Sequence, residues 1–144
     1  MIKNKLNSTQ IFNNCESSIV EVKAYTESVG TSYGTAEIFN KNGTLVTNAR
    51  VITYKQLGEY YEFDNISIRF IAENDYREVS IIKYDTKLKS GNPVFAIGNM
   101  SNYGLSITSG IVAIPHISIE YNDITRNVIQ CDITFTMGIV VGHY

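Results

Sequence analysis

Residues 91–99, GNPVFAIGN, and residues 106–112, SITSGIV, decide the fold of this chain. Each is a short run of apolar side chains that includes β-branched residues and lies next to residues that favour turns, which is typical of strands in an all-β protein. The pattern continues in both directions. It predicts strands at 18–25, 33–39, 44–47, 65–72, 79–83, 93–97, 106–114, 117–121 and 127–135, one short helical turn at 48–53 and a polar, tyrosine-rich loop at 55–64.

The composition agrees with an all-β protein built as one domain or two small lobes. The 144 residues include 10 Tyr and 6 Phe but no Trp. Aromatic and β-branched side chains favour strands over helices. The 12 Lys and Arg against 14 Asp and Glu give a net charge of -2. This balance argues against nucleic-acid binding, because proteins that bind phosphates are usually basic.

The sequence carries no targeting signal. No run approaches the roughly 18 apolar residues of a membrane-spanning helix, and no apolar run follows the lysines near the start, as a secretory signal would require. We therefore expect no membrane span. The compartment stays open, with the cytoplasm favoured.

The cysteines and histidines form no metal or redox motif. Cys15 and Cys131 match no zinc spacing, and a disulfide between them would need an oxidising compartment. His116, Glu120 and Asp123 lie close in sequence, but such a spacing arises by chance. We expect no metal and no cofactor, and Cys131 is predicted to be a small buried hydrophobe.

Four segments, read in order, resemble the trypsin-like serine proteases, and most closely their HtrA/Deg branch. YGTAEIF at 33–39 and NGTLVTNARV at 42–51 stand where the family has a glycine-rich strand, a glycine turn and Leu-Thr-Asn-x-His-Val. DYREVSIIK at 75–83 stands where it has Asp-Leu-Ala-x-Leu-Lys. GNPVFAIGN and SITSGIV resemble Gly-Asp-x-Val-x-Ala-Ile-Gly-Asn and Thr-Val-Thr-x-Gly-Ile-Val. IQCDITFTMGIVVG at 129–142 resembles Ile-Gln-Thr-Asp-Ala-x-Ile-x-x-Gly-Asn-Ser-Gly-Gly.

The resemblance implies a trypsin-like double β-barrel, with any site in the cleft between two perpendicular barrels. On this pattern residues 1–17 form an N-terminal extension, 18–84 the first barrel lobe, 85–92 a linker and 93–144 the second lobe. The family continues past its Gly-Gly with two further strands. We therefore expect the second barrel to be incomplete, with open strand edges.

The positions that carry the family's catalysis hold unsuited residues. Arg50 replaces the histidine that takes the proton of the serine, and a guanidinium has no lone pair to accept one. Val140 replaces the nucleophilic serine, and Glu78 stands at the carboxylate position. The backbone amides at Gly138 and Val140 correspond to the oxyanion hole, but their β-branched neighbours resist the turn that presents such amides. The resemblance therefore implies a site without an intact triad.

Arg50 and Glu78 are neighbours in the family's fold. Their opposite charges suggest that an ion pair replaces the imidazole–carboxylate hydrogen bond. The alternative is that both residues drifted independently.

Three functions are consistent with these features. The first is a catalytically inactive protease homologue, either a decayed fragment or a module that binds an extended peptide or protein by adding a strand to an open edge. The second is a serine endopeptidase with residual activity, which only the fold supports. The third is a structural β-domain that associates with itself through open strand edges.

Overall fold

The computed structural model describes residues 6–71, 76–79, 87–99, 102–121 and 123–134. Its elements, in chain order, are the helix α1 (Ser8–Cys15), the 3-10 turn η1 (Glu16–Ser18), β1 (Ile19–Thr26), β2 (Gly30–Ile38), β3 (Leu45–Thr47), the helix α2 (Ala49–Ile52), β4 (Thr53–Gln56), β5 (Glu59–Glu62), β6 (Asn65–Phe70), β7 (Pro93–Asn99), β8 (Leu105–Tyr121) and β9 (Ile124–Asp132).

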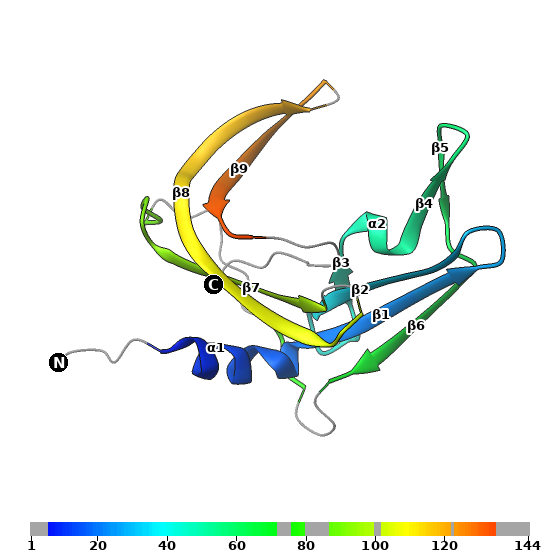
Figure 1. The fold of residues 1–144 in the computed structure, drawn as a ribbon, viewed down its shortest axis with the longest axis horizontal. Helices are drawn as coiled ribbons and strands as arrows, with labels where there is room; N and C mark the ends of the chain where they lie inside the picture. Colours follow the sequence, from blue (N-terminus) through cyan, green and yellow to red (C-terminus); the bar gives the residue numbers. More distant parts are fainter. Residues whose placement is uncertain (1–5, 72–75, 80–86, 100–101, 122, 135–144) are drawn as a thin grey trace.

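The strands form three antiparallel sheets (Figure 1). The first sheet has the order β3-β2-β1-β6, the second consists of β4 and β5, and the third has the order β7-β8-β9. The predicted all-β fold is therefore confirmed. The described strands form open sheets and no closed barrel.

One face of the first sheet carries a core of small and β-branched side chains. Val20 and Val22 of β1 pack there with Ala36 and Ile38 of β2, and α2 places Val51 on the same cluster. Because strand residues alternate between faces, the intervening side chains of β1 and β2 point to the opposite face. The sheet thus holds α2 through the buried Val51 and the half-buried Ile52 beside it, while Arg50 on the same helix is exposed.

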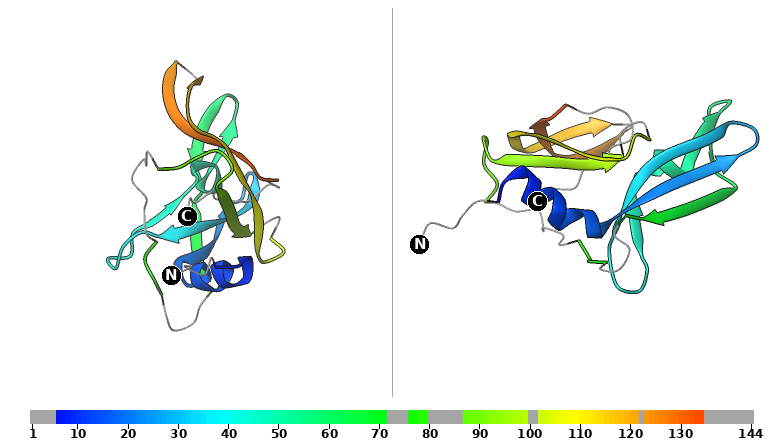
Figure 2. Two further views of the ribbon diagram at one scale, coloured as in Figure 1. Left: turned by 90° about the vertical axis from the view of Figure 1, so that its left-hand side faces the viewer. Right: turned by 60° about the horizontal axis from the view of Figure 1, so that its bottom comes forward.

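The helix α1 joins the first and third sheets (Figure 2). It begins with a capping box, in which the Asn7 side chain accepts from the Gln10 amide and the Gln10 side chain accepts from the Asn7 amide. At its end, Cys15 packs with Ile19 of β1 and Ile97 of β7. Part of the predicted N-terminal extension therefore belongs to the core. Neither helix in the described residues is long and apolar enough to cross a membrane.

Two predicted elements differ from the structure. The loop predicted at 55–64 is wrong, because β4 and β5 form a hairpin there. The strands predicted at 106–114 and 117–121 are one continuous strand, β8. The pairing of β8 with β9 shifts its register between Val112 and Ile114 and again between Ile114 and Ile117. The second irregularity contains Pro115, which has no N–H to donate to a ladder, and the first lies just before it.

The remaining predictions fall partly outside the described residues. The helical turn predicted at 48–53 is confirmed as α2. Most of the strand predicted at 79–83 lies outside, and of its residues only Val79 is described. The division into lobes at 18–84 and 93–144 stays a prediction.

Candidate functional site

Arg50 lies on α2, which directly follows β3. The side chain of Asn48 caps this short helix by accepting from the Arg50 amide at 3.2 Å, and the Val51 amide donates to the Asn48 carbonyl at 2.9 Å. Val51 is 4% exposed, whereas Arg50 is exposed. The helix is therefore held by its buried valine and presents its guanidinium to solvent.

Glu78 lies on a segment that two backbone hydrogen bonds fix to η1 and β2. The Arg77 amide donates to the Ser17 carbonyl at 3.1 Å, and the Val79 amide donates to the Ile38 carbonyl at 2.9 Å. The exposed Glu78 side chain stands at a hollow of about 650 Å³. The lining of this hollow is mainly apolar and comprises Ile38, Asn40, Lys41, Gly43, Leu45, Ile68, Phe70, Tyr76, Arg77 and Glu78. Arg50 is not among these residues.

Arg50 and Glu78 form no ion pair. Among the described residues, a salt bridge joins Arg69 to Glu21 and involves neither Arg50 nor Glu78. The predicted replacement of the imidazole–carboxylate bond is therefore wrong. The ion pair does not form because α2 directs Arg50 to solvent, while the backbone hydrogen bonds of Arg77 and Val79 hold Glu78 at the hollow.

The other two predicted site positions cannot be placed. Gly138 and Val140 lie outside the described residues. The structure therefore places two of the four predicted positions, Arg50 and Glu78, and does not bring those two together.

Cys131 is the remaining nucleophile that the sequence singled out. It lies on β9 opposite Val112 of β8 and is half-buried. Burial raises the pKa of the Cys131 thiol above its ordinary value. Because the thiolate is the reactive form, this thiol is a poor nucleophile at neutral pH. Within the described residues no three His, Cys, Asp or Glu side chains are grouped so as to hold a metal ion.

A polar link between the first and third sheets was missed by the sequence analysis. Asn99, at the end of β7, is 3% exposed, and its Nδ2 donates to Glu21 Oε1 of β1 at 2.9 Å. Its Oδ1 accepts from the Gly104 amide at 3.1 Å, and Glu21 is also paired with Arg69. Asn99 thus holds Gly104, just before β8, and contacts the first sheet. The only signal in the sequence is its place at the end of GNPVFAIGN.

Solved structures of proteases share this arrangement of strands. The Rv3671c protease of M. tuberculosis in its active form has a TM-score of 0.64 at 16% identity, over 89% of this chain and 64% of that protein. The HtrA-type protease AlgW, solved with a tripeptide, has a TM-score of 0.63 at 16% identity, over 92% and 48%. Deg5 has a TM-score of 0.59 at 19% identity, over 92% and 78%.

These similarities extend to the fold and no further. No known protein family's sequence profile matches the chain, and no curated protein matches it. The chain spans 64% of the length of the Rv3671c protease and 48% of that of AlgW. The described residues have the trypsin-like fold of the HtrA-type serine proteases.

Proposed function

We propose that this chain is a catalytically inactive homologue of the HtrA-type serine proteases that binds extended polypeptide segments. Arg50 carries the proposal. It stands at the family's base position, on a capped helix that presents it to solvent. A guanidinium stays charged at any working pH and cannot take the proton of a nucleophile.

The sequence at the other triad positions supports the same proposal. Val140 offers only methyl groups where the family has its serine. In a well-studied serine protease, loss of the serine or the histidine lowers the rate on the order of a millionfold. With both replaced, hydrolysis by this mechanism is expected to be undetectable.

Open strand edges support the binding of extended peptides. In the described residues, β3 and β6 are the outer strands of the first sheet, and β4 and β5 have no neighbour but each other. An outer strand has free N–H and C=O groups that an extended peptide can satisfy by pairing as a further strand.

Labelling with a fluorophosphonate probe tests the loss of catalysis. The wild-type chain is expected to remain unlabelled under conditions in which trypsin is labelled completely, and to leave a fluorogenic protein substrate intact. Covalent labelling of the wild-type chain, with hydrolysis of the substrate, would support a serine endopeptidase with residual activity and contradict the proposal.

A second candidate function is self-association as a structural β-domain. It is favoured by the outer strand β6, which exposes Ile66, Ile68 and Phe70 by 51%, 45% and 40%. These alternate residues share one face of the strand. Light scattering over a range of concentrations tests it, and a constant monomer mass would exclude it.

A further inference from the structure

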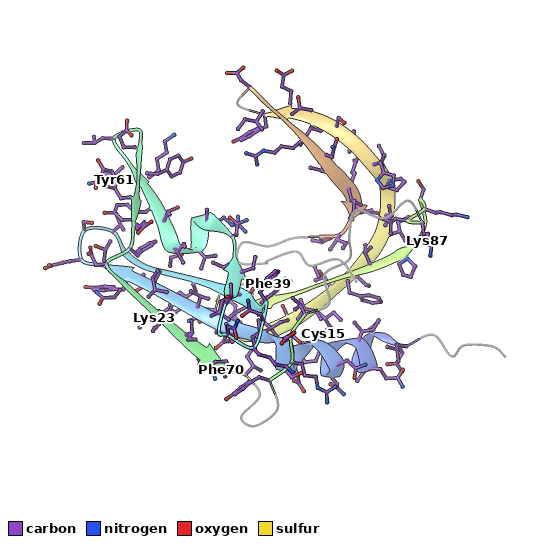
Figure 3. The ribbon with its side chains drawn as sticks, turned by 180° about the vertical axis from the view of Figure 1, so that it is seen from behind. Cys15, Lys23, Phe39, Tyr61, Phe70 and Lys87 are labelled. Carbon is purple, nitrogen blue, oxygen red and sulfur yellow. The ribbon has the colours of Figure 1, made fainter. Side chains whose placement is uncertain are left out.

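The β4–β5 hairpin directly follows α2 and projects away from the first sheet (Figure 1), and Tyr61 marks it in Figure 3. Its cross-strand pairs include Tyr54 with Tyr61 and Lys55 with Tyr60. Residues paired directly across two strands lie on the same face, and neighbouring pairs lie on opposite faces. The hairpin therefore presents tyrosine rings on both of its faces.

The first face is a stack of aromatic rings that stiffens the hairpin. The ring centroids of Tyr54 and Tyr61 are 5.7 Å apart with planes at 25°, and Tyr54 packs against Phe63 at 5.2 Å. Phe63 is buried, and its amide donates to the Ile52 carbonyl of α2 at 3.1 Å. These contacts hold Tyr61 in place while leaving it 46% exposed.

The second face already holds a cation on an aromatic ring. Tyr60 is 73% exposed, and the ammonium of Lys55 lies 5.4 Å from its ring centroid. The ring is thus accessible to a positive charge. A tyrosine face attracts such a charge through its quadrupole, and at exposed sites the attraction corresponds to about two- to fivefold in affinity.

The hairpin and the residues after it are acidic. Glu59, Glu62 and Asp64 outnumber the single cation, Lys55. Asp64 accepts a hydrogen bond from the Thr26 hydroxyl, which ties the base of the hairpin to the end of β1. Glu59 and Glu62 are exposed. This charge is complementary to a partner that carries Lys or Arg.

We infer that the β4–β5 hairpin is a docking surface for an extended polypeptide segment that carries Lys or Arg, and that this segment adds to the hairpin as a third strand. A two-stranded sheet is marginal by itself, and a third strand would pair with one of the two edges that have no neighbouring strand among the described residues. The cations of the segment then lie over the tyrosine rings and beside Glu59 and Glu62. The inference takes only the extended form of the partner from the proposed function and does not require that catalysis is lost.

A tryptophan-bearing peptide gives a direct test, because the chain itself has no Trp. We expect a peptide of alternating Arg and Thr residues with one Trp to bind, with affinity that falls as salt is added. A peptide with Glu in place of each Arg is expected not to bind. Two variants of the hairpin should each weaken binding by about two- to fivefold. One is Tyr60→Ala, and the other is the double variant Glu59→Gln with Glu62→Gln.

Tyr103→Ala is the matched control. This tyrosine lies between β7 and β8 and is 94% exposed, so its removal takes away an exposed ring of the same kind elsewhere on the molecule. Binding of the basic peptide should be unchanged in this variant. Circular dichroism verifies that each variant is folded, and slower hydrogen exchange at the amides of β4 or of β5 on peptide binding shows which edge the added strand occupies.

Three results would overturn the inference. They are equal binding of the acidic peptide, binding that the hairpin variants leave unchanged, and no binding at millimolar peptide. A mass that doubles with concentration and returns to the monomer in Tyr60→Ala would assign the surface to a second copy of the chain instead. None of these results changes the outcome of the fluorophosphonate labelling. The proposed loss of catalysis and the proposed docking surface can therefore be rejected independently.

Discussion

Gly34 determines how closely α2 approaches the first sheet. A Cβ at this position would lie 2.5 Å from Val51 Cγ2 and 2.8 Å from Val51 Cγ1. Valine is stiff about χ1 and cannot turn both methyl groups away. Gly34→Ala is therefore expected to lower the free energy of unfolding by about 1–3 kcal/mol, measured by urea denaturation.

A double-mutant cycle separates this clash from the intrinsic effect of alanine. Val51→Ala removes the two methyl groups, so Gly34→Ala should cost less in that background than in the wild type. Equal costs in the two backgrounds would show that the contact with Val51 is not responsible.

Glu37 gives a pH dependence with a defined sign. It lies on β2 between Ile19 and Val46, and burial raises the pKa of its carboxyl above the ordinary value of 4.5. The folded state therefore binds this proton more tightly than the unfolded state. The resulting loss of stability is present above the folded pKa and is relieved as the pH falls toward the unfolded value.

Glu37→Gln removes this titration. The variant is expected to be more stable than the wild type at neutral pH, and the difference should shrink as the pH is lowered toward 4.5. Urea denaturation between neutral and acidic pH measures both curves. Parallel curves over the whole range would contradict the assignment to Glu37.

Local sequence was sufficient for the helical turn at 48–53. It was predicted because the alternation of apolar and polar residues breaks there, and α2, which carries Arg50, lies within those residues. The expected contact between Arg50 and Glu78 is absent. The position of Glu78 is set by the backbone hydrogen bonds of its neighbours to Ser17 and Ile38, which are distant in the sequence. Asn99 was missed for the same reason, since its partner Glu21 is 78 residues away.

The turn of the β4–β5 hairpin is strained at one residue. Leu57 has a φ of 50° and Gly58 a φ of 90°, which is the pattern of a type I′ turn. The left-handed backbone conformation costs a leucine about 1–2 kcal/mol of conformational free energy, whereas asparagine tolerates this conformation. Leu57 is also 97% exposed, so no packing is lost when it is replaced.

Leu57→Asn is therefore expected to stabilise the hairpin. Hydrogen exchange at its amides should slow by about three- to fivefold, which corresponds to somewhat less than 1 kcal/mol. Gly58→Ala is the opposing control and should speed exchange at the same amides. Faster exchange in Leu57→Asn would show that the leucine contributes a contact that offsets the strain.

Whole elements were predictable where apolar and polar residues alternate. Strands β1 and β6 follow such alternation and were found within two residues of their bounds. The hairpin was missed, because Leu57 replaces the asparagine that usually marks such a turn. The long strand β8 was divided in two, because Pro115 is a usual strand breaker and only the tertiary structure shows the irregular pairing that accommodates it.

At the scale of the whole molecule, the first and third sheets pack against each other through a common cluster of buried side chains. Cys15, Ile19 and Ile97 form one buried cluster, to which β8 adds Leu105 and Ile107. The polar link between Asn99 and Glu21 crosses the same boundary. Because each sheet buries part of its apolar surface against the other through this cluster, the two are expected to unfold in one cooperative transition.

Ile97→Ala tests this coupling. The variant is expected to lose about 2–5 kcal/mol of unfolding free energy. In the wild type and in Ile97→Ala alike, the unfolding transition followed by far-ultraviolet circular dichroism should coincide with the one followed by tyrosine fluorescence. The ten tyrosines are spread along the whole chain, so fluorescence reports on both sheets. Two separate transitions, with only the later part of the chain shifted by Ile97→Ala, would show that residues 85–92 link two lobes that fold independently.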